Sequence, residues 1–261
     1  MNVPCGRGRT LLVMGILNVT PDSFSDGGLW ATADSAVRHA LDMIDQGASI
    51  IDIGAESTRP GCEPVSAAEE WSRLEPVLSE LLPIVDVPIS VDTMKAEVAE
   101  RSISMGVDII NDVNGLRGEG MMEVCASSDV DVVISHMYGE YGDMHSAVMG
   151  DDYRESIKAF LDSQCAKARD MGICDRRIIV DPGIGFGKTA EQNLSLAKDC
   201  SFLGHEHRIL VGVSRKRFIR SLFPEMDVDV ATAKVSKMAV DSGADIVRVH
   251  DVRTTVSELG L

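Results

Sequence analysis

Residues 87–112, VPISVDTMKAEVAERSISMGVDIIND, contain two short apolar runs on either side of a helical segment. The runs at 87–91 and 108–112 do not alternate apolar with polar residues, which is typical of strands buried on both faces in a parallel sheet. The segment 94–105 has a helical pattern and stops at Gly106, a common residue at helix ends. This stretch therefore predicts a strand, a helix and a second, parallel strand.

The same unit recurs along the chain. Further runs rich in Val and Ile lie at 11–17, 49–54, 131–135, 177–181, 208–213 and 245–249. Helical patterns fall between them, at 153–171 and 231–242, and the capping boxes at 66–69 and 189–192 open two more helices.

Eight such units in 261 residues match a (β/α)8 TIM barrel, whose usual length is about 250 residues. An α/β doubly wound open sheet is the alternative arrangement of the same elements. No linker or low-complexity tract interrupts the pattern, so we expect one domain over residues 1–261.

The composition narrows the classes of partner. Lys and Arg total 25 against 41 Asp and Glu, so the net charge is −16 and neither nucleic acid nor an anionic membrane surface is expected as a partner. No run of 18 apolar residues is present, so no membrane span is expected. The six cysteines are scattered without a CxxC pair, which favours reduced thiols and a cytoplasmic location.

Polar residues end nearly every predicted strand. In a (β/α)8 barrel the active site lies at the carboxyl ends of the strands, so these residues are the candidates for function. They are Asn18, Asp92, Asn111, Asp112, His136, Asp181, Ser214, Arg215, Lys216, Arg248, His250 and Asp251, with residues 56–59 after the second strand. Carboxylates, amides and cations at one mouth suit a polar heterocycle that carries an anion.

Two further patterns bear on ligands. The segment 205–220 holds five Arg or Lys residues against one Glu, which predicts a local patch that attracts anions. The glycine-rich segment 181–188, DPGIGFGK, fits neither the Walker A spacing nor GxGxxG, so it does not predict a nucleotide loop. The histidines form no zinc pattern, and Mg²⁺ held by Asn18, a substrate phosphate and water is favoured instead.

Seven segments of the chain resemble the dihydropteroate synthase family. They lie at 14–28, 51–61, 89–93, 109–115, 180–189, 211–218 and 246–252, in the family's order and over nearly the whole chain. The resemblance implies a (β/α)8 barrel, in agreement with the count of strands. It also implies an enzyme, a homodimeric transferase that joins 6-hydroxymethyl-7,8-dihydropterin diphosphate to p-aminobenzoate and releases diphosphate with Mg²⁺.

The resemblance assigns roles to individual residues. The pterin would be bound by Asp92, Asn111, Asp181, Lys216 and Arg248. The diphosphate would be bound by Asn18, Arg248 and His250, with Asn18 near Mg²⁺. The aminobenzoate pocket would be formed by Phe24, Thr58, Arg59, Pro60, Phe186, Ser214 and Arg217. In catalysis diphosphate leaves first, Asp92 stabilises the resulting pterin-methyl cation with support from Asp26, and Lys216 holds the pterin.

Three departures from the family pattern concern the second substrate and the packing. The segment 135–146, SHMYGEYGDMHS, lacks the Thr-Pro that the family often has there, the segment 226–238 is unusual, and the last helix is short. They concern the arylamine more than the pterin, and three alternatives are considered beside the synthase. The enzyme could use a ribosylated aminobenzene phosphate as its arylamine, it could be a pterin-dependent methyltransferase, or it could bind pterins without catalysis.

Overall fold

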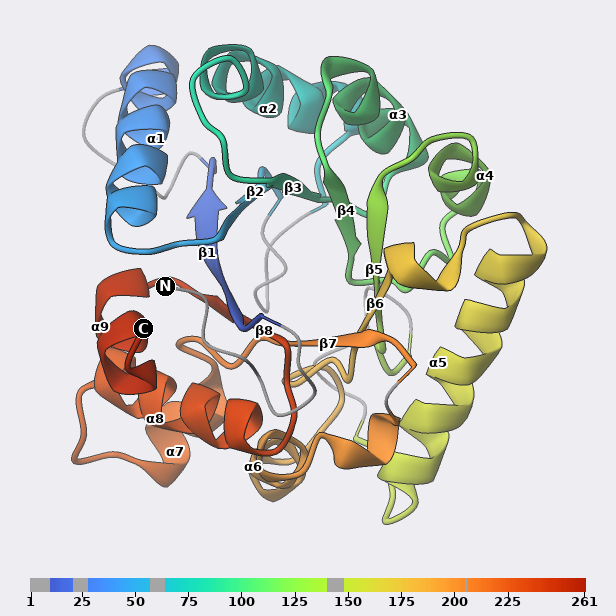
Figure 1. The fold of residues 1–261 in the computed structure, drawn as a ribbon, viewed down its shortest axis with the longest axis vertical. Helices are drawn as coiled ribbons and strands as arrows, with labels where there is room; N and C mark the ends of the chain where they lie inside the picture. Colours follow the sequence, from blue (N-terminus) through green and yellow to red (C-terminus); the bar gives the residue numbers. More distant parts are fainter. Residues whose placement is uncertain (1–9, 21–27, 57–63, 140–147, 205) are drawn as a thin grey trace.

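The structure is a computed structural model that describes residues 10–20, 28–56, 64–139, 148–204 and 206–261. Its eight parallel strands form a closed barrel in the order β1 to β8 (Figure 1). The strands are β1 (Leu12–Asn18), β2 (Ile50–Gly54), β3 (Ile89–Asp92), β4 (Ile109–Asp112), β5 (Asp131–Ser135), β6 (Ile178–Asp181), β7 (Arg208–Val211) and β8 (Ile246–Val249). The first and last strands pair in parallel, which confirms the barrel and excludes the open sheet.

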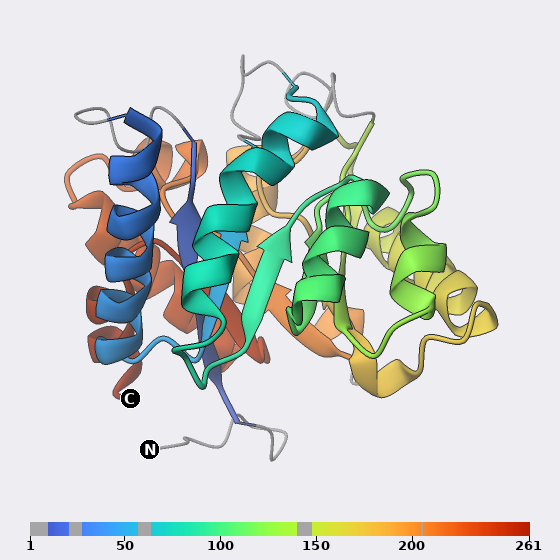
Figure 2. The same ribbon diagram turned by 90° about the horizontal axis from the view of Figure 1, so that it is seen from above.

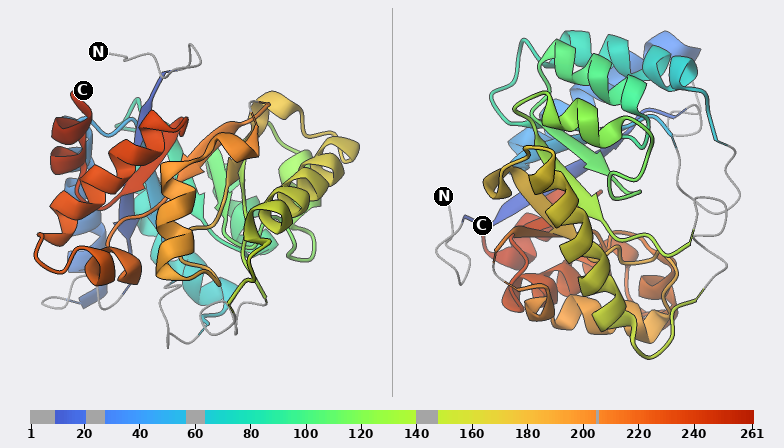
Figure 3. Two further views of the ribbon diagram at one scale, coloured as in Figure 1. Left: turned by 90° about the horizontal axis from the view of Figure 1, so that it is seen from below. Right: turned by 90° about the vertical axis from the view of Figure 1, so that its right-hand side faces the viewer.

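Helices follow the strands and surround them (Figure 1). They are α1 (Gly28–Asp45), α2 (Ala67–Leu81), α3 (Ala96–Met105), α4 (Met121–Ala126), α5 (Tyr153–Asp170), α6 (Ala190–Lys198), α7 (Arg217–Leu222), α8 (Val228–Asp241) and α9 (Val252–Leu259). Figures 2 and 3 show from three further sides that these helices lie along the outside of the strands. None of the helices in the described parts of the chain has the length and apolar character that a membrane span requires.

Local sequence signals explain several helix boundaries. The side chain of Thr189 accepts the backbone N–H of Gln192, and the Gln192 side chain accepts the N–H of Thr189, which is the predicted capping box of α6. At α2 the Ser66 side chain accepts the N–H of Glu69, so half of the second predicted box forms. Gly106 ends α3 with φ at 100°, a left-handed conformation that suits glycine.

The interior of the barrel is layered along its axis. Its lower layer is an apolar plug of buried side chains from seven strands, Met14, Ile50, Ile109, Val133, Ile179, Leu210 and Ile246. Side chains on a strand alternate in direction, so the residues two positions further on also face the interior. Most of those residues are polar: Asp52, Asn111, Ser135, Asp181 and Arg248. The barrel therefore changes from an apolar plug to a polar floor toward the carboxyl ends of its strands.

The other face of each strand packs against the helices. Ile51, Val91 and Ile110 belong with Leu74 of α2 and Ile157 of α5 to one large buried cluster. This shell between strands and helices holds the barrel in shape, because burying each large aliphatic side chain stabilises the fold by about 1.5–3 kcal/mol. The polar floor is thereby set in a rigid frame.

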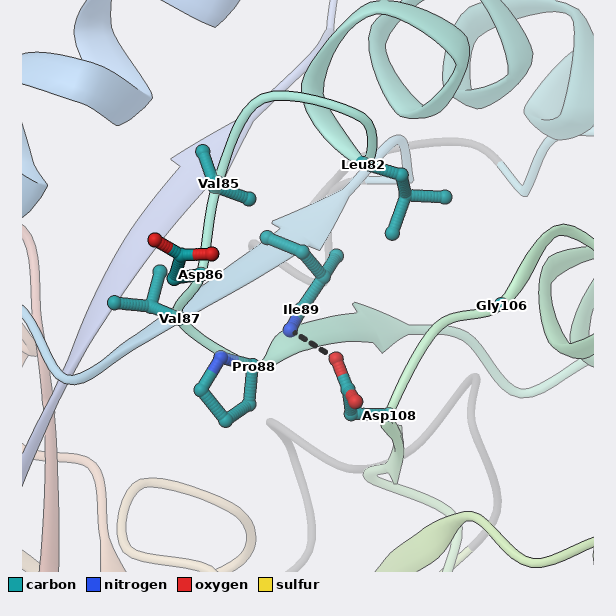
Figure 4. Close-up of a pocket in the computed structure, with 8 residues that line it drawn as sticks. All are labelled: Leu82, Val85, Asp86, Val87, Pro88, Ile89, Gly106 and Asp108. Carbon is teal, nitrogen blue, oxygen red and sulfur yellow. Dashed lines mark hydrogen bonds between the residues drawn. The ribbon is translucent and has the colours of Figure 1, made fainter.

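A pocket of about 250 Å³ lies at the opposite end of the barrel, at the starts of β3 and β4 (Figure 4). Its lining residues are Leu82, Val85, Asp86, Val87, Pro88, Ile89, Gly106 and Asp108. There Oδ2 of Asp108 accepts the backbone N–H of Ile89 at 2.8 Å, a bond that joins the two strand starts. None of the residues predicted to act on a substrate lines this pocket, so we do not place the active site here.

Candidate active site

Arg248 lies at the centre of the polar floor, where residues from four strands meet. Its Nε donates to Oδ2 of Asp52 at 2.6 Å, and its Nη2 donates to Oδ2 of Asp92, also at 2.6 Å. The Nδ2 atom of Asn111 donates to the same Asp52 oxygen at 3.2 Å. The structure thus brings Asp92, Asn111 and Arg248 together, as expected from their positions near strand ends.

The glycine-rich turn after β6 forms the neighbouring wall. Oδ1 of Asp181 accepts the N–H of Gly183 at 2.6 Å. The Nζ atom of Lys216 donates to the carbonyl oxygen of Ile184 and lies 4.8 Å from the centre of the Phe186 ring. An added Cβ on Gly185 would come within 2.9 Å of Cδ of Lys216, so a glycine there gives the lysine room to cross the turn.

The ends of β7 and β8 are joined by a serine and a histidine. Oγ of Ser214 lies 2.8 Å from Nδ1 of His250 and accepts the backbone N–H of His250 at 3.0 Å. Ser214 is buried and His250 is half-buried. Asn18 ends β1 beside Gly54 of β2 and is also half-buried. These three predicted residues therefore all stand at the carboxyl end of the barrel.

Burial and charge shift the titration of the residues around the floor. Burial raises the pKa of Asp92 to about 7, although the nearby Arg248 opposes this shift. Burial also lowers the pKa of Lys216 to about 8, with Asp181 opposing. Burial alone would lower the pKa of Arg248, but Asp52 and Asp92 hold it above its ordinary value. Shifted groups gathered at one place in this way are typical of active sites.

A buried lysine holds the glycine-rich turn from behind. The Nζ atom of Lys188 donates to the carbonyl oxygens of Gly183 at 2.8 Å and Phe186 at 2.9 Å, and it lies 3.1 Å from Nδ1 of His136. Burial, reinforced by Lys188, lowers the pKa of His136 to about 3, so its imidazole is neutral and can accept from the ammonium group. This contact connects the end of β5 to the turn that carries Phe186.

The basic patch expected at 205–220 is not continuous, so this prediction is wrong. Arg208 starts β7 and pairs with Asp131 at the start of β5, at the end of the barrel away from the mouth. Arg215 forms two hydrogen bonds with Asp229, at 2.7 and 2.8 Å. The rest of β7 lies between Arg208 and the other four cations of the segment, so Arg208 is held at the far end of the barrel. Lys216 reaches the polar floor through its contact with the turn after β6.

Several predicted residues are not placed by the structure. Asp26, Phe24, Thr58, Arg59 and Pro60 lie outside the described residues. Arg217, in contrast, is placed by the structure: it is exposed at the first position of α7, a helix of six residues. Over the described ranges, no group of three or more His, Cys, Asp or Glu side chains is arranged to hold a metal ion by itself.

The sequence reasoning missed Asp52 and Lys188. Asp52 lies in the middle of β2 and not at its end, so a search of strand ends passes over it. Its position two residues after the inward-facing Ile50 is a signal that could have identified it. Lys188 was noted only as a residue that broke a glycine pattern, and the sequence holds no local sign of its burial.

Comparison with known proteins identifies the family. Residues 14–250 match the family described as pterin binding enzyme. A dihydropteroate synthase of Bacillus subtilis (strain 168) is 45% identical over 249 residues, which cover 93% of this chain and 84% of the relative. The chain belongs to the dihydropteroate synthase family. A further member, from Escherichia coli (strain K12), is 42% identical over 95% of this chain and 89% of its own length.

Solved structures of dihydropteroate synthases agree with this assignment. The Xanthomonas albilineans enzyme, solved with 4-aminobenzoic acid, has a TM-score of 0.89 and 39% identity, over 99% of this chain and 96% of that one. The Burkholderia cenocepacia enzyme, solved with 7,8-dihydropteroate, has a TM-score of 0.88 and 35% identity, over 99% and 94% of the two chains. The family predicted from the seven segments is confirmed, and this chain is a transferase of the dihydropteroate synthase family.

Proposed function

We propose that the polar floor and the surrounding strand ends carry out the dihydropteroate synthase reaction. In this reaction 6-hydroxymethyl-7,8-dihydropterin diphosphate and p-aminobenzoate give 7,8-dihydropteroate and diphosphate. The observation that carries the proposal is Arg248 held between two carboxylates, Asp52 and Asp92, inside the mouth of the barrel. Such a half-buried cation beside carboxylates suits a substrate with both a donor-rich ring and an anionic leaving group.

The pterin binds to the floor through complementary hydrogen bonds. Its amino and ring N–H groups donate to carboxylates, for which Asp92 and Asp181 are available. Its carbonyl group accepts from Lys216, and Asn111 adds an amide beside Asp92 in the strand register. A planar heterocycle is recognised in this way by its edge, because the donors of the ring meet carboxylates and its carbonyl group meets the ammonium group of Lys216.

The cation of Arg248 and the polar side chains at the ends of β1 and β8 would assist the departure of diphosphate. Arg248 and His250 belong to the end of β8 and would contact the leaving group, and Asn18 ends the neighbouring strand β1. Preorganised donors aimed at developing negative charge are among the largest contributors to catalysis. We infer that these residues lower the barrier to breaking the bond between the pterin methylene carbon and the diphosphate oxygen.

The reaction then proceeds through a pterin-methyl cation. The bond to diphosphate breaks first, and the ionised Asp92 stabilises the cation, with Asp26 as further predicted support. The nitrogen of p-aminobenzoate attacks the methylene carbon and loses a proton to water or diphosphate. No covalent enzyme intermediate is required. Phe186, Ser214 and Arg217 would form the described part of the aminobenzoate pocket, and the predicted Phe24, Thr58, Arg59 and Pro60 would complete it.

The residues present fit a Mg²⁺ ion shared with the substrate. Mg²⁺ commonly takes one or two protein oxygens together with substrate phosphate oxygens and water. Asn18 offers an amide oxygen at the end of β1, on the side of the mouth assigned to diphosphate. When bound there, the ion supplies neutralisation of the negative charge on the diphosphate.

Three further expectations accompany this function: a single domain over residues 1–261, a cytoplasmic location and a homodimer. Four described cysteines, Cys125, Cys165, Cys174 and Cys200, are free thiols, which supports the cytoplasmic location. The proposed homodimer rests on the resemblance to the family alone. Sedimentation velocity measures the association directly.

A coupled assay tests the proposed function. The enzyme is given the pterin diphosphate and Mg²⁺ with either p-aminobenzoate or the ribosylated aminobenzene phosphate, and diphosphate release and product mass are followed. We expect 7,8-dihydropteroate from p-aminobenzoate. Lys216→Ala should abolish most turnover, whereas Lys237→Ala, at an exposed lysine of α8, should not. Pterin binding without product from either amine, or full turnover by Lys216→Ala, contradicts the proposal.

A further inference from the structure

Asp52 is a fully buried carboxylate beneath the active site. Its Oδ2 accepts hydrogen bonds from Nε of Arg248 at 2.6 Å and from Nδ2 of Asn111 at 3.2 Å. Its Oδ1 accepts from Oγ of Ser90 at 2.5 Å. The side chain has no exposed surface, and its contacts join β2 to β3, β4 and β8.

The strand register places Asp52 one layer below Asp92. Asp52 pairs with Ser90, whereas Asp92, two residues further along β3, pairs with Gly54. Asp52 therefore lies between the apolar plug and the layer of Asp92. Because Arg248, Asn111 and Ser90 surround its two oxygens, the carboxylate meets these side chains and not the substrate.

The bond to Asp52 determines how Arg248 is oriented. Nε and Nη2 lie on one edge of a planar guanidinium group, and here each donates to a different carboxylate. Two such bonds fix both the plane of the guanidinium group and its rotation within that plane. With Asp92 alone, the guanidinium could turn about its single remaining contact.

The same carboxylate determines how Asn111 is oriented. An ionised carboxylate only accepts hydrogen bonds, so the atom of Asn111 that faces Asp52 must be the amide nitrogen. The amide oxygen of Asn111 is then the atom turned away from Asp52. Asn111 accordingly presents an acceptor, and it selects a ring edge that carries a donor.

We propose that Asp52 is a positioning residue for the reaction, which holds the plane of Arg248 and the amide orientation of Asn111 toward the pterin diphosphate. The identity of that substrate rests on the function proposed above. Asp52 acts through Arg248 and Asn111, so its removal should weaken use of the pterin substrate more than use of the arylamine.

The charge of Asp52 also acts on Asp92. Asp92 is faced by Arg248 from β8, Asp52 from β2, Glu70 from α2, Asp112 from β4 and Lys216 after β7. Of these, Asp52 raises the pKa of Asp92, and its negative charge is lost when it is replaced by asparagine. The acid limb of the pH profile for kcat/KM of the pterin substrate should then move to lower pH, a readout that reports the charge of Asp52 near Asp92 separately from the fall in kcat/KM.

The test compares Asp52→Asn with the wild-type enzyme in the coupled assay. Loss of hydrogen bonds to charged groups predicts a fall in kcat/KM for the pterin diphosphate of about ten- to a hundredfold. The KM for p-aminobenzoate should change less than about twofold, since Asp52 contacts neither Phe186 nor Ser214 in the observed bonds. The acid limb should shift to lower pH in the same variant.

Asp245→Asn provides a matched control. Asp245 is a buried aspartate just before β8, at the other end of the barrel, and its Oδ2 accepts the N–H of Ile209 at 2.9 Å. Its replacement should lower the urea midpoint of unfolding while leaving kcat/KM and the acid limb at wild-type values. The comparison separates the general effect of losing a buried aspartate from the specific effect of losing Asp52 beneath Arg248.

The results distinguish failure of the inference from failure of the proposed function. Wild-type enzyme without product contradicts the function. Wild-type turnover together with a folded Asp52→Asn variant of unchanged kcat/KM and pH profile contradicts only the positioning role. If Asp52→Asn does not fold, Ser90→Ala, which removes one donor to Asp52, should lower kcat/KM for the pterin substrate about two- to fivefold, and an unchanged value overturns the inference.

Discussion

Replacing Gly183 with alanine should disrupt the turn that positions Asp181 at the mouth. Gly183 has φ at +67°, and an added Cβ would lie 1.7 Å from the carbonyl oxygen of His136. That oxygen belongs to the backbone, so a change of side-chain rotamer cannot remove the overlap. Either the turn or the end of β5 must move.

The size of the effect follows from the contacts that this movement breaks. The left-handed conformation itself costs an alanine about 1 kcal/mol. Restoring a normal contact requires a shift of roughly 1.5 Å. Such a shift breaks the bond from the Gly183 N–H to Asp181 and the bond from Lys188 to the Gly183 carbonyl, each worth about 1–2 kcal/mol. The expected loss in the free energy of unfolding is therefore about 3–5 kcal/mol.

Urea unfolding followed by circular dichroism measures this loss, and Gly172→Ala is its control. Gly172, just after α5, has φ at +100°, but an added Cβ would meet nothing within 4 Å. Its replacement should cost only the conformational part, about 1 kcal/mol. Equal losses for the two variants, together with an unchanged KM for the pterin diphosphate, would refute the reasoning from the overlap.

Three other outcomes are expected. Phe186→Ala, which removes the ring beside Lys216, should raise the KM for p-aminobenzoate about fivefold and that for the pterin less than twofold, and equal changes in steady-state kinetics would contradict this assignment. The kcat/KM for the pterin diphosphate should fall as pH decreases through about 7, where Asp92 gains a proton, and a flat activity profile between pH 5 and 8 would argue against a role for Asp92. The raised pKa of this carboxyl has the opposite effect on the free energy of unfolding: its contribution to stability is fully present below pH 3.8 and is lost as pH rises through about 7. Removing divalent ions with a chelator should abolish diphosphate release without altering the urea midpoint, and undiminished turnover would exclude the Mg²⁺ proposal.

The fold could be predicted because its signals are local in sequence. A buried strand such as Ile109–Asp112 is visible as a run of apolar residues, and a helix end is marked by a residue such as Gly106. Repetition of these signals eight times indicates the barrel before any contact is known. The rule that sites lie at the carboxyl ends of strands then predicts Asp92, Asn111 and Arg248 as candidates, and the structure brings these three side chains together.

What could not be predicted depends on partners that are distant along the chain. The partner of Arg208 is Asp131, 77 residues away, and without it the arginine was counted in one basic patch with residues 215–220. Lys188 lies 52 residues from His136, and its burial depends on how the turn folds back. The charge of a stretch of sequence is therefore a statement about composition. Where each charged side chain lies in the fold decides whether its charge acts at the mouth of the barrel or at the opposite end.

The pairing of Arg248 has a consequence for how the protein folds. This arginine is 196 residues from Asp52 and 156 residues from Asp92, so the pairs form only when the last strand joins the second and third. Until then two carboxylates are drawn into the interior without their counter-ion, which opposes early closure of the barrel. During synthesis these acids leave the ribosome long before their partner. We therefore expect docking of β8 to be a late, slow and charge-dependent step of folding, in keeping with its many non-local contacts.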